Sequence, residues 1–101
     1  MIAELLTEGK ENARPGREIC DMLNISSRDL MAAVERERRE GAAICASSGA
    51  NPGYYLAADK REMQDYCRFL FRRGSETMKT YRACKETAEK MPEVIEHEAI
   101  V

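Results

Sequence analysis

The sequence predicts a mostly helical protein of the α+β class, with short helices, then a two-stranded β-hairpin, then a long C-terminal helix. Apolar residues at helical spacing lie on both sides of a turn at residues 24–27. Two runs rich in β-branched and aromatic residues flank a loop of turn-forming residues, 47–53. From residue 59 to residue 91, apolar residues recur every three or four positions with no proline between them.

The segment before the turn predicts two short helices. Residues 2–8 carry apolar side chains at helical spacing, and residues 9–13 form a connector. The next helix begins near Gly16 and ends at Asn24, because asparagine readily adopts the left-handed conformation that ends a helix. Ile25 is then expected to point into the core.

The helix after the turn has clear signals at both ends. Ser26 or Ser27 is the expected N-cap, and Asp29 lies early in the helix, where the helix dipole favours an anion. Gly41 ends the helix after a basic last turn. The expected buried stripe is Leu30, Ala33 and Val34.

Residues 43–47 and 54–57 predict two short strands of a hairpin. The loop SSGANPG between them consists of residues that favour turns. Tyr55 and Leu56 are expected to pack in the core with Ile44, because alternation along a strand leaves at most one of two neighbouring tyrosines outside.

The long helix is predicted over residues 59–91, with Asp59 as N-cap and Glu62 in the capping-box position. Its length would be about 50 Å, and only Gly74 weakens the pattern. Aromatic side chains at 66, 69 and 71 widen the apolar face of its first half, which is expected to pack on the preceding domain. The seam that resembles a heptad repeat is Met63, Cys67, Leu70, Gly74, Thr77, Tyr81, Cys84, Ala88 and Met91.

The domain organisation follows from these elements. Residues 1–58 form the expected domain, 59–91 the long helix, and 92–101 a flexible tail. A dimerisation arm is the favoured interpretation of the helix, because its apolar stripe needs burial and the 58 preceding residues offer limited surface. The alternative is a helix that folds back on its own domain.

The charge of the chain is weakly acidic and uneven. The net charge is −2, and charged residues make up 34% of the sequence. Residues 1–58 hold 7 Lys/Arg and 9 Asp/Glu, whereas residues 59–91 hold 9 and 6. DNA-binding proteins usually have a basic excess, so the total charge counts against that function. No apolar run is long enough to span a membrane, and the N-terminus lacks the pattern of a signal peptide.

Several site classes are not expected. The cysteines at 20, 45, 67 and 84 are widely spaced and the one histidine is His97, which argues against a zinc site. Four mostly buried, reduced thiols in a cytoplasmic protein are expected instead. The sequence has no catalytic triad, phosphate-binding glycine loop or metal cluster, so we expect no enzyme activity, no cofactor and no small-molecule substrate.

The order of helix, helix, turn, helix and hairpin resembles a winged helix-turn-helix DNA-binding domain of biotin-operon-repressor type, as in bacterial and prophage regulators. The resemblance covers residues 2–58. It rests on the segment EICDMLNIS (18–26), the helix that ends at Gly41, and the sequence GYYL (53–56). It implies a small dimeric transcriptional regulator or recombination accessory protein that binds double-stranded DNA.

In that family the helix after the turn enters the major groove and the hairpin, called the wing, lies on the adjacent backbone. Arg28 and Arg36 would then bind a guanine edge or phosphates. Arg38 faces away from the presumed groove, where ion pairs with neighbouring glutamates on a solvated face are the simpler interpretation. The implied DNA contacts are Ser27, Arg28, Met31, Ala32, Glu35, Arg36 and Arg39, with Arg14 and Arg17 before the turn and Ser47, Ser48 and Asn51 in the wing.

The sequence departs from the family in two places. The wing loop has no lysine or arginine, and Met31 and Ala32 are apolar where base-reading side chains commonly lie. These departures, with the net acidity of residues 1–58, leave a second hypothesis open. Under it the domain is a protein-interaction or assembly module that does not bind DNA.

Overall fold

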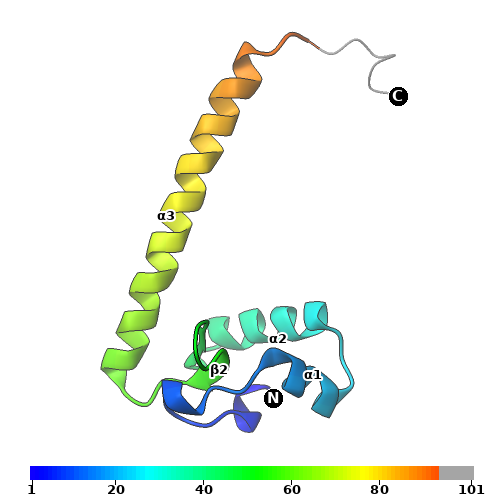
Figure 1. Cartoon of the computed structure of the whole chain (residues 1–101), viewed down its shortest axis with the longest axis vertical. Coiled ribbons are helices and arrows are strands. Elements are labelled where there is room, and N and C mark those ends of the chain that lie inside the picture. Colours follow the sequence, from blue (N-terminus) through cyan, green and yellow to red (C-terminus); the bar gives the residue numbers. More distant parts are fainter. Residues whose placement is uncertain (94–101) are drawn as a thin grey trace. The chain divides into compact units, whose positions relative to one another are not determined.

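The computed structural model describes residues 1–93 and confirms the predicted fold class (Figure 1). Two helices precede an antiparallel two-stranded hairpin, and a long helix follows it. The chain divides into two compact units, which are residues 1–68 and the residues from Phe69 onward. The first two turns of the long helix therefore belong to the first unit, ten residues beyond the boundary expected at 58. Most of the predicted flexible tail, 94–101, lies outside the described residues. The elements are η1 (Ala3–Leu5), η2 (Lys10–Asn12), α1 (Gly16–Leu23), α2 (Ser27–Arg39), β1 (Ile44–Ser47), β2 (Gly53–Leu56) and α3 (Lys60–Lys90).

The turn between α1 and α2 forms as its sequence predicts. Asn24 ends α1 in the left-handed conformation, with φ 55° and ψ 50°. The hydroxyl of Ser26 accepts a hydrogen bond from the N–H of Asp29 at 3.0 Å, which makes Ser26 the N-cap of α2. These local signals fix the angle at which α2 leaves the turn.

The hairpin separates two apolar clusters. Its register pairs Ile44 with Leu56 and Cys45 with Tyr55, so successive side chains point to opposite faces. Tyr55 packs with Cys45 and Tyr66 of α3, so its predicted contact with Ile44 was wrong, although its burial was predicted. Leu56 does pack against the cluster that contains Ile44. The main cluster is Ile2, Leu6, Ile19, Leu30, Val34 and Ile44, with Ile25 and Ala33 partly buried against it.

The helix predicted over residues 2–8 is wrong beyond Leu5, since only a short 3₁₀ turn, η1, is present. The chain instead extends along the free edge of β2. Leu56 donates a backbone hydrogen bond to Thr7 at 3.0 Å, and Gly9 donates one to Leu56 at 2.8 Å. A strand edge with unpaired N–H and C=O groups satisfies this segment better than a second helical turn would.

The start of α3 is capped close to the prediction. Asp59 accepts a hydrogen bond from the N–H of Glu62 at 2.9 Å, and the Glu62 carboxylate accepts one from Ala58 at 2.8 Å. Tyr66 is buried against the hairpin, but Phe69 and Phe71 are 37% and 76% exposed. Both belong to the second unit, so their packing on the domain stays a prediction. The Arg73 guanidinium lies 5.6 Å from the centroid of the Phe69 ring, within the range of a cation–π contact.

The expected burial of the cysteines was only partly correct. Cys45 is fully buried and Cys20 is half-buried, whereas Cys67 and Cys84 are exposed. Burial raises the pKa of the Cys45 thiol, which keeps it protonated and unreactive. The two exposed thiols lie on α3, outside both apolar clusters.

Gly53, at the start of β2, provides a test of this packing. Its φ of 137° is unfavourable for other residues, and an added Cβ would overlap the carbonyl group of Arg14. We expect Gly53→Ala to lower the free energy of unfolding by about 3 kcal/mol in a denaturant titration. Gly49→Ala is the matched control, because its φ is 109° but open space surrounds it, and it should cost about 1 kcal/mol. Equal losses for the two variants would contradict the close approach at Gly53.

Candidate nucleic-acid interface

The outward face of α2 is the candidate binding surface. A helix turns about 100° per residue, which places Arg28, Ala32, Glu35 and Arg39 on one line along it. Met31 lies on one side of this line. All seven α2 residues predicted to contact DNA are exposed: Ser27, Arg28, Met31, Ala32, Glu35, Arg36 and Arg39.

A shallow groove of about 480 Å³ lies beside this face, within the first unit. Arg17 of α1, Ser27 and Met31 of α2 and Tyr54 of β2 contribute to its lining. The fold thus brings together three residues that the sequence predicted as contacts, from two different helices. Arg17 is exposed, so its guanidinium can reach a ligand on this surface.

Arg14 is held more tightly than the sequence suggested. Its guanidinium lies 3.6 Å from the Glu18 carboxylate and 3.1 Å from the sulfur of Met22. Its backbone pairs with Tyr54 of β2 in both directions, at 2.8 and 2.9 Å. These contacts join the segment before α1 to the hairpin, and they leave Arg17 as the more accessible of the two arginines.

The hairpin loop uses two of its predicted contact residues internally. The Asn51 amide donates to the carbonyl of Glu11 at 2.7 Å, and the Ser47 hydroxyl donates to the carbonyl of Asn51 at 3.0 Å. The first bond holds the loop against the η2 segment, and the second closes the loop on itself. Ser48, the third predicted contact in the loop, is exposed.

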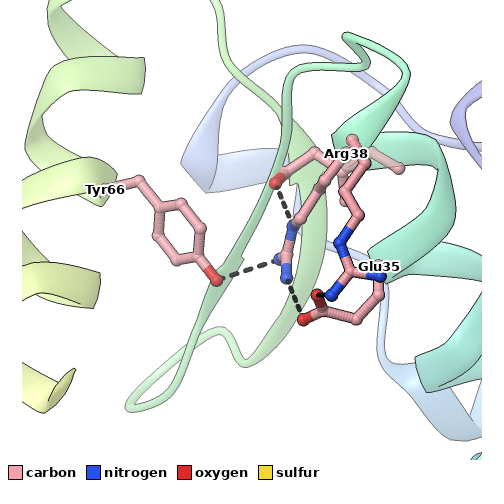
Figure 2. A network of polar contacts seen from close by, with 5 residues as sticks. Glu35, Arg38 and Tyr66 are labelled. Carbon is pink, nitrogen blue, oxygen red and sulfur yellow. Dashed lines mark hydrogen bonds and ion pairs between the residues drawn. The ribbon is translucent and has the colours of Figure 1, made fainter.

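Arg38 connects α2 with the hairpin and with α3 (Figure 2). Its guanidinium donates to the Ile44 carbonyl and to the Tyr66 hydroxyl, both at 2.9 Å. Burial raises the pKa of Tyr66, although the positive charge of Arg38 opposes that effect. The predicted pair with Glu35 is present at 3.7 Å, but the solvated face predicted for Arg38 was wrong, since its side chain is only 20% exposed.

The positive charge on the outer face of α2 is concentrated at two residues. Glu35 lies 3.7 Å from Arg38 and 3.5 Å from Arg39, and so offsets charge at that end of the helix. None of the ion pairs found within residues 1–93 involves Arg28 or Arg36. Those two guanidinium groups are therefore available to an external anion.

Sequence reasoning missed Glu37, which it assigned to the solvated face. Its carboxylate is buried and accepts hydrogen bonds from the N–H groups of Ile2 and Ala3, at 2.7 and 3.0 Å. Burial acts to raise its pKa, but these bonds and the N-terminal ammonium at 3.6 Å outweigh burial and lower the pKa. The available signal was its position seven residues after Leu30 and three after Val34, which continues the buried stripe of α2.

The seam predicted on α3 divides between the two units. Met63 is half-buried and packs with Tyr66 on the second apolar cluster, so it belongs to the domain's own core. Leu70 and Tyr81 are 42% and 54% exposed. The other exposed seam residues in the described part of the chain are Cys67, Gly74, Thr77, Cys84, Ala88 and Met91.

No protein-family model, curated protein or solved structure matches this chain. The topology is compatible with a winged helix-turn-helix domain on its own geometry. Across residues 1–93, no helix is long and apolar enough to cross a membrane. In the same residues, no three His, Cys, Asp or Glu side chains group closely enough to hold a metal ion.

Proposed function

We propose that this protein binds double-stranded DNA as a winged helix-turn-helix domain, with α2 in the major groove and the β1–β2 hairpin as the wing. The observation that carries the proposal is the outer face of α2, where Arg28 and Arg36 are exposed and form no ion pair with the described residues. The capped turn between α1 and α2 supports it, because that turn presents α2 at a fixed angle.

Four of the predicted contacts have a defined chemical role in this proposal. Arg28 lies in the first turn of α2 and would bind the O6 and N7 acceptors of a guanine, or a phosphate. The hydroxyl of Ser27 and the free N–H groups at the start of the helix would hold a backbone phosphate. Arg17, across the groove, would add a second phosphate contact, and Met31 would meet a thymine methyl group.

The biological role proposed is that of a small dimeric regulator of transcription or a recombination accessory protein. Two copies would associate through the exposed stripe of α3, which includes Leu70 and Tyr81. A two-fold dimer would recognise a pseudo-palindromic site, because each copy reads the same half-site on opposite strands.

A second candidate function is a protein-interaction or assembly module. The observations that favour it are the apolar side chain of Met31 in the groove and the absence of lysine and arginine from the loop at 48–52. The net acidity of residues 1–58 also suits a protein partner better than a polyanion.

Charge reversal on α2 separates the two candidates. The double variant Arg28→Glu with Arg36→Glu should bind duplex DNA at least about 100-fold more weakly than the parent, because two attractive contacts become repulsive. Fluorescence anisotropy with labelled duplex at low salt measures this change. Thermal unfolding should be nearly unchanged, since both side chains are exposed.

The matched control reverses two charges on α3, Lys79→Glu with Lys90→Glu, which are exposed and far along the chain from α2. Its DNA affinity should stay within a few-fold of the parent. Equal binding by the parent and the α2 variant would refute the proposed site. A parent that does not bind DNA at low salt would favour the interaction module.

A further inference from the structure

An exposed apolar stripe runs along α3 from Cys67, near the end of the first unit, to Cys84 in the second. Successive seam residues from Cys67 to Cys84 are separated by alternating steps of three and four, which keeps them on one side of the helix. Leu70, Met78 and Tyr81 are 42%, 47% and 54% exposed, and Phe71 beside the stripe is 76% exposed. A helix of this kind gains its stability by burying the stripe against another surface.

The stripe is complementary to its own reversed copy. Consider two copies of α3 that run antiparallel and are related by a two-fold axis between residues 75 and 76. Cys67 of one copy then lies opposite Cys84 of the other, Leu70 opposite Tyr81, and Gly74 opposite Thr77. The two small central layers let the helix backbones approach closely, and the large Leu70–Tyr81 layers lie on either side of them. This arrangement pairs residues 67–84 of the two helices and leaves Met63 in the apolar cluster of its own domain.

The residues that flank the stripe select this arrangement over its alternatives. It places Phe71 beside Met78 of the second helix, so two exposed apolar side chains meet. Moving the axis by half a heptad, to residue 79, would place Phe71 beside Lys85 instead. A parallel pair would place Arg73 beside Met78 and stack Gly74 on Gly74, which leaves a hollow layer between the Leu70 and Thr77 layers.

We propose that α3 pairs with α3 of a second copy in antiparallel orientation, about a two-fold axis between residues 75 and 76, so that each Cys67 lies opposite Cys84 of the other copy. This inference rests on the association proposed above and is independent of DNA binding. The arrangement separates the first turns of the two α3 helices by about 46 Å, whereas a parallel pair would hold them about 10 Å apart.

Chemical cross-linking of the full chain tests both orientation and register. A short-spacer bis-maleimide joins two thiols: each sulfur bonds to one maleimide carbon, and its proton goes to the neighbouring carbon. The background variant Cys20→Ser removes the half-buried thiol, and Cys45 stays because it is buried. In this background we expect a covalent dimer on a denaturing gel.

Single substitutions then distinguish antiparallel from parallel pairing. Cys67→Ser and Cys84→Ser should each abolish the covalent dimer, because neither leaves two thiols facing each other, and mixing the two variants should restore it. Covalent dimers from either variant alone would show parallel pairing and overturn the proposal. A sedimenting dimer without any cross-link in the background variant would overturn the register.

A monomer in sedimentation at high micromolar concentration would overturn the association itself. That result would leave the proposal of DNA binding standing, since the anisotropy measurement with duplex DNA tests it separately. The variant with both Cys67→Ser and Cys84→Ser is the control for non-specific reaction and should give no covalent dimer.

Discussion

Replacing Glu37 with alanine should lower the free energy of unfolding by about 3 kcal/mol. The Glu37 carboxylate is the acceptor for the N–H groups of Ile2 and Ala3. Removing it leaves these donors without their acceptor, at about 1–3 kcal/mol for each buried group. Because Ile2 is part of the main apolar cluster, the N-terminal segment should also loosen. Urea titration followed by circular dichroism measures the change.

Two comparisons make this test specific. Glu37→Gln keeps an acceptor oxygen and should cost less, about 1–2 kcal/mol. Glu40→Ala removes an exposed carboxylate one position beyond α2 and should change stability by less than about 0.5 kcal/mol. If Glu37→Ala were as stable as Glu40→Ala, the carboxylate would not hold the N-terminal segment.

The same carboxylate makes stability depend on pH in a defined direction. The pKa of Glu37 is lower in the folded than in the unfolded protein. Its contribution to the free energy of unfolding is therefore complete above the unfolded pKa, which is about 4.3. As the pH falls below that value, protonation of Glu37 removes the contribution. The parent should therefore lose more stability on acidification than Glu37→Ala does.

Placing arginine at both Leu70 and Tyr81 should convert the dimer into a monomer and weaken DNA binding by about 100-fold or more. Both side chains lie in the proposed pairing stripe, and a charge there would be buried against the second helix. Two linked DNA-binding domains bind more tightly than one, by about 10²–10⁴-fold in affinity, and this gain is lost in a monomer. Sedimentation velocity and anisotropy measure the two effects.

The control adds the same net charge to the other side of α3, as Ala83→Arg with Glu86→Gln. Both positions are exposed and lie away from the stripe, so this variant should remain dimeric. A parent that is monomeric, or a stripe variant that stays dimeric, would contradict association through α3.

Signals within a few residues of one another were sufficient to predict most of the fold. Asn24 and Ser26 define the turn, and Asp59 marks the start of α3. Each works through a backbone conformation or a capping bond that its own neighbours complete. The same reasoning predicted exposure of the outer face of α2, because helical periodicity separates that face from Leu30 and Val34.

The features that the sequence did not reveal depend on contacts between distant residues. In the sequence Arg38 is one charge in a run of arginine and glutamate, but its hydrogen-bond partner Tyr66 lies 28 residues away. The sequence predicts that Asn51 is a loop residue available to a ligand, but its amide donates a hydrogen bond to the carbonyl of Glu11, 40 residues earlier. The helix predicted over 2–8 failed for the same reason, since the edge of β2 supplied a competing partner for its backbone.

Binding of DNA by α2 is best measured as retention of the protein on a random-sequence genomic DNA pool at two salt concentrations, with the retained fragments sequenced. We expect retention at low salt that falls steeply with added salt, by about 10³-fold between about 50 and 200 mM if about six phosphates are contacted. We also expect enrichment of a two-fold symmetric sequence. Absence of retention even at low salt would contradict DNA binding by α2 and identify the outer face of α2 as a surface for a protein partner.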